Sequence, residues 1–252
     1  MPLHLRLLLP TLGLGLGFGL GFIQPIGLAV GLLFIALLLA ADKALPERLW
    51  WCLSLLASIA LAAHLVPGFA PWPLSMPRQI SSDAAPYTVR LSWDKLLVGL
   101  TLLAWWLGQA RGRAPRAQQA WTVVLLTLAG IPLLALALDL VGWQPKWSEQ
   151  LWLWLAVNLG VAVLAEELVF RGLLQTRLVG WLGIWPGILL TAVLFGAVHV
   201  PFSPLFAVVA AIAGLGYGLA FHYSGRLRVA VALHGAVNLS HLLLLSYPLR
   251  LA

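Results

Sequence analysis

Two adjacent glutamates are the side chains in this sequence most suited to chemistry. Glu166 and Glu167 lie in a mostly apolar run that carries no other charge between Leu151 and Arg171. At the centre of a bilayer each charge costs at least about 2.5 kcal/mol, so an ionisable residue at that depth indicates a functional site. Arg171 lies four residues after Glu167 and therefore on the same helix face, where the two side chains can approach each other.

Two further polar groups interrupt the apolar runs that follow. His199 comes four residues after Phe195, and Asn238 comes four residues after His234. Four-residue spacing places the members of each group on one helix face. The three polar groups fall on three different predicted helices.

These residue types together predict hydrolysis. A carboxylate removed from water is a stronger base, and a neighbouring carboxylate acts in the same direction. A histidine opposite that base can share an activated water, while a second histidine with an asparagine one turn on offers two hydrogen-bond donors to an oxyanion. None of the three groups contains a serine or a cysteine, so the pattern does not indicate a covalent nucleophile.

The composition predicts that these groups lie in a membrane. Hydrophobic residues make up 62% of the 252 residues and charged residues only 9%, whereas a soluble domain has about a quarter charged residues. The 13 tryptophans suit aromatic belts at the two membrane interfaces. The formal charge of +7 is spread over short clusters between apolar runs, which argues against nucleic acid as a partner. The single Cys52 excludes an internal disulfide and a thiolate metal cluster.

We expect an all-α fold, a polytopic bundle of about eight or nine transmembrane helices with an intramembrane polar cavity. A crossing needs roughly 20 apolar residues, and charge clusters and Pro/Gly turns divide the chain into candidate spans. These are approximately Leu5–Phe22, Ile26–Ala41, Leu49–Val66, Lys95–Gly108, Trp121–Val141, Leu151–Val179, Trp185–Val200, Leu205–Tyr223 and Val229–Ser246. The first two are short and glycine-rich, so either could be re-entrant or interfacial instead.

Charge placement predicts the orientation of the spans. The strongest basic cluster consists of three arginines, Arg111, Arg113 and Arg116. Placing this cluster inside puts the N-terminus inside as well. The proline-rich stretch from Pro67 to Asp94 then lies outside as an exposed loop. It divides the chain into residues 1–94, with the N-terminal helices and this loop, and residues 95–252, a transmembrane catalytic domain with its core at about 150–245.

A helical hairpin predicted near Gly183 relates the first two polar groups. Glu167 and His199 each lie sixteen residues from Gly183. In antiparallel helices with a rise of 1.5 Å per residue, both side chains then fall about 24 Å from the turn, at the same depth. The depth of His234 stays open, because it lies only a few residues into its span. His241, seven residues later, lies near the same face as His234.

The motifs Glu-Glu-x-x-x-Arg, Phe-x-x-x-His and His-x-x-x-Asn, in this order on successive spans, resemble the CAAX protease and bacteriocin-processing family, also called CPBP or ABI. The resemblance covers roughly residues 150–245. Members of that family are intramembrane endopeptidases and include the type II CAAX prenyl proteases. The resemblance implies a peptidase acting on a membrane-associated or lipidated protein or peptide in the bilayer. It also implies a multi-pass integral membrane protein, which we expect in a prokaryotic inner membrane.

The resemblance further implies roles for the residues at the motif positions. Glu166 would activate water as the general base with the help of His199, while His234 and Asn238 would form the oxyanion hole. Glu167 would belong to the same catalytic group and hold its geometry, with Arg171 and Phe195 as supporting residues.

A metal ion is the open alternative to this mechanism. Two glutamates and two histidines could supply zinc ligands, and the ligands would then be Glu166, His199 and His234. However, the sequence contains no His-Glu-x-x-His pair, and the glutamate-and-water mechanism of the family needs no metal. We therefore expect no cofactor, with zinc as the alternative.

Two other classes of function fit a membrane protein with buried polar groups. A non-catalytic immunity or partner protein of the same fold could keep the polar cluster for packing or ligand binding. A proton-coupled transporter would use Glu and His as a proton relay and would be built from two similar halves. Residues 1–150 contain no second copy of the three motifs, which weighs against the transporter.

Overall fold

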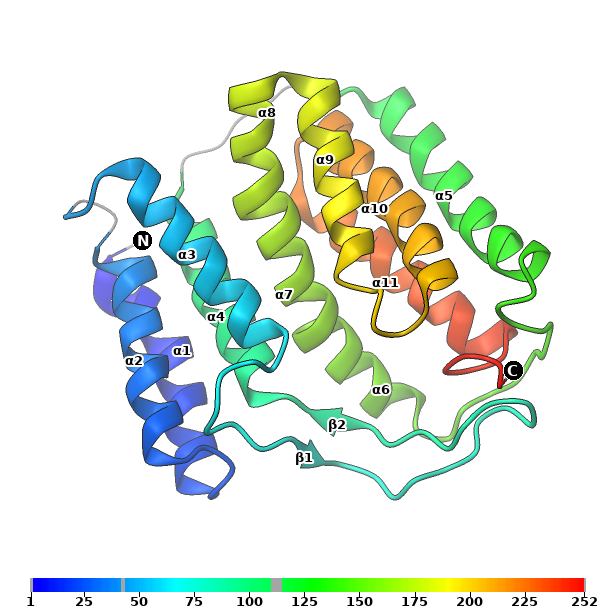
Figure 1. Cartoon of the computed structure of the whole chain (residues 1–252), viewed down its shortest axis with the longest axis horizontal. Coiled ribbons are helices and arrows are strands. Elements are labelled where there is room, and N and C mark those ends of the chain that lie inside the picture. The colour runs from blue at the N-terminus through cyan, green and yellow to red at the C-terminus, as the bar shows by residue number, and fades with distance from the viewer. Residues whose placement is uncertain (1, 42–43, 110–114, 252) are drawn as a thin grey trace. The chain divides into compact units, whose positions relative to one another are not determined.

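The computed structural model describes residues 2–41, 44–109 and 115–251, and nearly all regular structure in these ranges is helical (Figure 1). Among the described residues the strands are β1 (Trp72–Pro73) and β2 (Arg90–Leu91), which pair antiparallel. The all-α class predicted from the hydropathy pattern is confirmed.

The chain folds into two compact units, each built from three separate segments. Unit 1 comprises Met1–Ser75, Arg90–Arg111 and Ala156–Leu173. Unit 2 comprises Met76–Val89, Gly112–Leu155 and Leu174–Ala252. Packing therefore joins segments that lie far apart in the chain. The division predicted after residue 94 follows chain order and stays a prediction.

Within the described residues, unit 1 contains four helices and the middle of a longer one. The four are α1 (Leu3–Gly19), α2 (Pro25–Leu39), α3 (Glu47–Ala62) and α4 (Trp93–Leu107). Pro25 is the first residue of α2, a position where the missing N–H of proline costs nothing. Trp51 of α3 donates its indole N–H to Leu173 O in the longer helix at 3.1 Å. This bond connects α3 to the segment that carries the two glutamates.

The longer helix runs from Leu151 to Leu182, 32 residues, and contributes to both units. It consists of α6 (Leu151–Val157), the π-helical segment η1 (Asn158–Val163), α7 (Leu164–Glu167), a second π-helical segment η2 (Leu168–Gln175) and α8 (Thr176–Leu182). In Figure 1 the labels α6, α7 and α8 follow one continuous ribbon. The predicted span Leu151–Val179 is confirmed, with its end three residues later.

Unit 2 adds four further helices, α5 (Ala117–Ala137), α9 (Ile184–Ala197), α10 (Pro204–Ser224) and α11 (Leu227–Leu244). The start of α10 is capped by Ser203, whose hydroxyl accepts the Phe206 N–H at 3.0 Å. Its end is marked by Gly225, which adopts a left-handed conformation with a φ of +64°.

Several helices have the length and composition of membrane spans. Within the described residues, the four long ones are Ala117–Ala137, Leu151–Leu182, Pro204–Ser224 and Leu227–Leu244. Three shorter apolar helices are Leu3–Gly19, Pro25–Leu39 and Ile184–Ala197. Each predicted span coincides with a helix to within a few residues, and the chain is an integral membrane protein. Arg111 and Arg113 lie outside the described residues, so the inside location of the N-terminus stays a prediction.

The helices α8 and α9 form the predicted hairpin about Gly183. This glycine has a φ of +88°, a conformation that costs glycine little and other residues much. The two helices approach so closely that a Cβ on Gly187 would lie 2.6 Å from Val179 N. A glycine is therefore required where α9 crosses the end of α8.

His199 lies just beyond a helix rather than inside one. The predicted span Trp185–Val200 is too long at its end, because α9 stops at Ala197 and His199 lies in the turn toward α10. Pro201 provides the physical reason, since a proline disfavours helical backbone in the residue before it. The histidine of the second motif is thus positioned by a turn.

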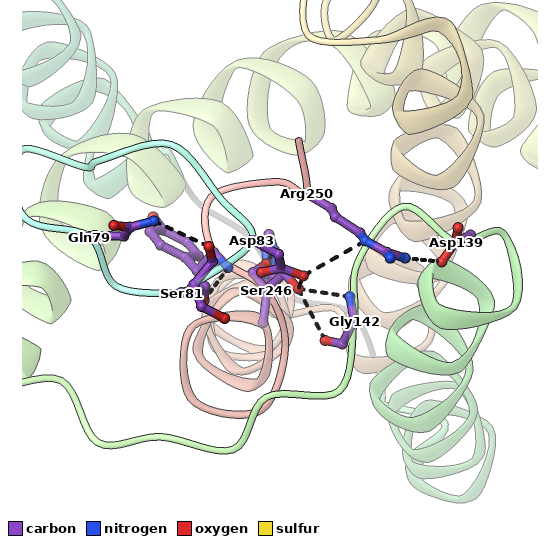
Figure 2. A network of polar contacts seen from close by, with 10 residues as sticks. Gln79, Ser81, Asp83, Asp139, Gly142, Ser246 and Arg250 are labelled. Atoms are coloured by element: carbon purple, nitrogen blue, oxygen red, sulfur yellow. Dashed lines mark hydrogen bonds and ion pairs between the residues drawn. The ribbon is translucent and has the colours of Figure 1, made fainter. Parts of the chain in front are cut away.

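The loop formed by residues 76–89 binds the C-terminal tail of unit 2 (Figure 2). Ser246 is fully buried; its hydroxyl donates to Asp83 Oδ2 at 2.7 Å and accepts the Gly142 N–H at 2.8 Å. Arg250 forms ion pairs with Asp83 and with Asp139. These side chains join three irregular segments, and backbone bonds join them as well, such as Ser246 N–H to Gly142 O at 2.9 Å.

The loop predicted as exposed from Pro67 to Asp94 is partly buried. Ser81 is 3% exposed and Ala84 is 0% exposed. The Ser81 hydroxyl accepts the Tyr247 N–H at 2.9 Å, so the tail covers this part of the loop. Its proline-rich composition indicated a loop but contained no sign of the segment that packs on it.

We predict that Gly187→Ala destabilises the protein by about 1–3 kcal/mol, because the added methyl group would overlap the backbone of α8. Gly180→Ala is the matched control, since nothing lies within 4 Å of a Cβ at that position. Alanine there should be neutral or stabilise by up to about 1 kcal/mol. Thermal unfolding in detergent measures both variants, and equal Tm values would contradict the close approach.

A second prediction concerns Ser246→Ala, which should destabilise by about 1–3 kcal/mol because it removes the partner of both Asp83 and the Gly142 N–H. The Ser246 hydroxyl also holds the pKa of Asp83 below its ordinary value. The stability from Asp83 is therefore complete above the ordinary pKa of about 3.9 and is lost as the pH falls through the lowered value.

The difference in Tm between the wild type and Ser246→Ala should accordingly be larger at neutral pH than at about pH 3. Ser240→Ala serves as the control, because that hydroxyl donates to Val237 O within its own helix at 2.7 Å. The interpretation of Ser246 fails if Ser240→Ala causes the same loss of Tm.

Candidate functional site

The second glutamate and the arginine of the first motif form a buried ion pair in unit 1. Arg171 Nη1 lies 3.0 Å from Glu167 Oε1, and both side chains are 0% exposed. This contact is the one predicted from their four-residue spacing. Removing two charges from solvent is costly, and the pair is tolerated because each charge has an opposite charge at hydrogen-bond distance.

The helix around the glutamates is irregular. Glu166 and Glu167 end the short α-helical segment α7, and π-helical segments lie on both sides of it, Asn158–Val163 and Leu168–Gln175. Single π-helical turns inside α-helices occur frequently at functional sites, because they change the direction in which side chains project. The hydropathy pattern predicted one continuous helix and gave no indication of these segments.

The first glutamate has a partner that the motifs do not contain. Lys95 Nζ of α4 lies 3.2 Å from Glu166 Oε1, and the two side chains are 23% and 20% exposed. Lys95 was not predicted as a site residue from the sequence; it was only the first residue of a predicted span. A charged residue at that boundary was a signal, but its distance of 71 residues from Glu166 in the chain concealed the pairing.

Unit 2 contains a cavity of about 100 Å³ between α5, α9, α10, α11 and the C-terminal tail. Its lining is mostly apolar, with branched aliphatic, alanine and phenylalanine side chains. The polar side chains that line it come from turns and helices far apart in the chain: His199, Tyr217, His234, Asn238 and His241. The second and third motifs therefore meet at one cavity, and their role in a common site stays a prediction.

His234 is held between aromatic rings. It is 5% exposed, and its ring stacks on Tyr217 with centroids 4.5 Å apart and an interplanar angle of 16°. Phe195 meets the same imidazole edge-on at 5.7 Å. Tyr217 was not predicted as a site residue, because a tyrosine in an apolar helix is ordinary core packing by sequence criteria. The stacking fixes the plane of the His234 ring.

Phe195 positions His199 through its backbone. His199 Nδ1 lies 2.7 Å from Phe195 O, and the two rings lie 4.8 Å apart. A carbonyl oxygen only accepts, so Nδ1 carries the proton and donates it, which leaves Nε2 of the neutral ring as the acceptor. Nε2 of His199 is thus the nitrogen able to take a proton from water.

His241 lines the same cavity but uses its ring to hold the tail. Its Nε2 lies 2.9 Å from Ser246 O, just beyond the end of α11. This bond ties the helix end to the segment that Asp83 also binds. His241 accordingly connects the cavity wall to the tail network.

The predicted site residues fall into two sets. Unit 1 contains Glu166, Glu167 and Arg171, and unit 2 contains Phe195, His199, His234 and Asn238. Across the described residues, no group of three or more His, Cys, Asp or Glu side chains is arranged to hold a metal ion. The alternative zinc ligands Glu166, His199 and His234 come from both units.

The described residues form a helical membrane protein with several spans. One span carries paired carboxylates, and a cavity in unit 2 is lined by two histidines and an asparagine of the other motifs. These features characterise a class of membrane proteins with polar residues buried within their spans. Residues 147–240 match a family model described as Rce1-like, type II CAAX prenyl endopeptidase Rce1-like. The match over these residues confirms the resemblance seen in the three motifs. At the level of the family, the match supports a CAAX-type intramembrane protease, and hence a peptidase.

The matched segment contains every site residue predicted from the motifs, from Glu166 to Asn238, and also Tyr217. Lys95 and α5 lie outside it. No curated protein and no solved structure was found to match the chain.

The buried pair leads to a stability prediction. Glu167→Gln should destabilise by about 3–5 kcal/mol, because it deprives the buried Arg171 guanidinium of its carboxylate. The double variant Glu167→Gln/Arg171→Met removes both charges and should recover most of that loss. Thermal unfolding of the purified protein measures both variants.

An exposed ion pair provides the control for this prediction. Arg78 and Glu149 pair with side chains that are 56% and 79% exposed, so Glu149→Gln should cost at most about 1 kcal/mol. A loss for Glu149→Gln as large as that for Glu167→Gln would contradict the assignment of a buried pair.

Proposed function

We propose that the protein is an endopeptidase that cuts a membrane-associated or lipidated protein or peptide in the plane of the membrane, using water activated by Glu166. The observation that carries this proposal is the convergence of the second and third motifs on one cavity in unit 2, within the segment that matches the protease family. An apolar lining with few polar groups suits a substrate with a hydrophobic segment or a lipid tail.

The residues of unit 2 supply the polar contacts of the proposed reaction. His234 and Asn238 would donate hydrogen bonds to the oxygen of the scissile carbonyl, and the ring of Tyr217 supports this role because it holds the His234 imidazole in one plane. His199 would share the attacking water through Nε2, since its Nδ1 proton is given to Phe195 O.

The residues of unit 1 supply the base. In the proposed reaction Glu166 takes a proton from water while the water oxygen bonds to the carbonyl carbon, and the carbonyl electron pair moves to its oxygen. When the carbonyl forms again, the C–N bond breaks and the proton held by Glu166 passes to the leaving nitrogen. Glu167 would support this geometry, because its ion pair with Arg171 fixes the helix turn that carries both glutamates.

The proposed route uses no metal, with zinc bound by Glu166, His199 and His234 as the alternative. We also propose a prokaryotic inner membrane with the N-terminus inside as the location. The substrate would be a prenylated protein ending in a CAAX sequence, or another membrane-associated peptide such as a leader peptide or bacteriocin precursor.

The test is cleavage of a prenylated CAAX peptide and its unprenylated counterpart by the protein reconstituted in lipid, with the released fragment measured by mass spectrometry. Glu166→Gln and His199→Ala should each lower kcat by about 10²–10⁴-fold, because each removes a group that handles the proton. His234→Ala and Asn238→Ala should lower kcat by about 10²–10³-fold through loss of an oxyanion donor.

Glu149→Gln is the control for glutamate replacement, because Glu149 is exposed and should leave cleavage unchanged. Wild-type kcat in Glu166→Gln would overturn the proposed base. A chelator in the same assay separates the two routes: activity lost to the chelator and restored by zinc would overturn the route without a metal.

A further inference from the structure

We infer that Lys95 is a positioning residue that holds the Glu166 carboxylate in place, an inference that rests on the proposed role of Glu166 as the base. Lys95 lies on α4, outside both the three motifs and the segment that matches the family. Its ammonium nitrogen lies 3.2 Å from Glu166 Oε1. The contact joins the two long side chains across two packed helices of unit 1.

The backbone places Lys95 beside the base. Gly99 lies four residues after Lys95 and therefore on the same face of α4. A Cβ on Gly99 would lie 3.7 Å from the Cβ and the backbone N of Ala165, the residue directly before Glu166. Small residues thus let the two helices approach closely one turn along from the ion pair, so the Lys95 stem spans a short gap.

The start of α4 is itself anchored. Asp94 is 3% exposed; its Oδ2 lies 2.7 Å from His64 Nδ1, and its Oδ1 accepts the Lys95 backbone N–H at 2.8 Å. The Asp94 carboxylate therefore fixes the backbone of Lys95, while the Lys95 side chain extends to Glu166. The Lys95 ammonium is therefore held in one place, because the start of α4 is fixed.

The chemistry of the pair explains what Lys95 would do. A carboxylate group rotates easily, and an ammonium that holds one oxygen restricts the direction of the other. Both side chains are about one-fifth exposed, so their attraction is screened less than that of a surface pair. A displacement of a reacting group by about 1 Å can cost about 10²-fold in rate. Lys95 therefore acts on the reaction through Glu166 and not by touching the substrate.

The experiment compares Lys95→Met, Lys95→Arg and Glu166→Gln in the reconstituted cleavage assay. Lys95→Met should lower kcat by about 10-fold to 100-fold with little change in KM, because the substrate cavity is untouched while the base loses its support. Lys95→Arg keeps the charge in a different geometry and should restore most of kcat. Arg90→Gln, which removes an exposed charge five residues earlier, should leave both constants unchanged.

A measurement of folding keeps the test independent of activity. Because Lys95 pairs with Glu166, Lys95→Met should lower Tm more in the wild type than in the Glu166→Gln background. Equal losses of Tm in the two backgrounds would overturn the pairing.

The activity outcomes separate this inference from the proposed function. An inactive Glu166→Gln together with wild-type kcat in Lys95→Met would overturn the role of Lys95 alone. A loss of kcat in Lys95→Arg as large as that in Lys95→Met would also overturn this role. Wild-type cleavage by Glu166→Gln would overturn the proposed mechanism first, and the role of Lys95 with it.

Discussion

The free energy needed to remove charge from water dictates how the polar groups of this protein are arranged. Glu167 and Arg171 are completely buried in a long apolar helix, and their 3.0 Å contact is what makes that burial tolerable. Glu166, one residue earlier, meets Lys95 from another helix instead. Each glutamate is thereby tied to a different cation, which holds the two adjacent carboxylates in two different environments.

In unit 2 the arrangement depends on aromatic contacts and backbone acceptors. The His234 ring lies against Tyr217, and the His199 ring donates to Phe195 O. Imidazole rings held in this way keep a defined plane and tautomer, which a hydrolytic site needs if its donors and acceptors are to meet a carbonyl group. A mostly apolar cavity surrounds both rings, and such a lining suits the hydrophobic or lipidated substrate proposed above.

A separate set of polar contacts stabilises the irregular segments of unit 2. Ser246 links the tail to Asp83 and Gly142, and His241 links the end of α11 to the tail. Backbone groups in such segments lie outside a regular helix or sheet, so side chains satisfy some of them, and backbone bonds such as Leu251 N–H to Asp83 O satisfy others. Because Leu245 and Leu249 of the tail also line the cavity, the network that fixes the tail shapes the cavity wall as well.

The sequence by itself determined the helical membrane class, the spans, the hairpin at Gly183 and the Glu167–Arg171 pair, because hydropathy runs and four-residue spacing are local properties of a chain. It also indicated the three motifs and their family. Tertiary structure alone decided that Lys95 meets Glu166, that Tyr217 stacks on His234, and that the loop near Ser81 is buried by the tail. These contacts join residues from different helices or distant loops. The periodic pattern of one helix shows which of its residues share a face, but it does not show which other segment packs against that face.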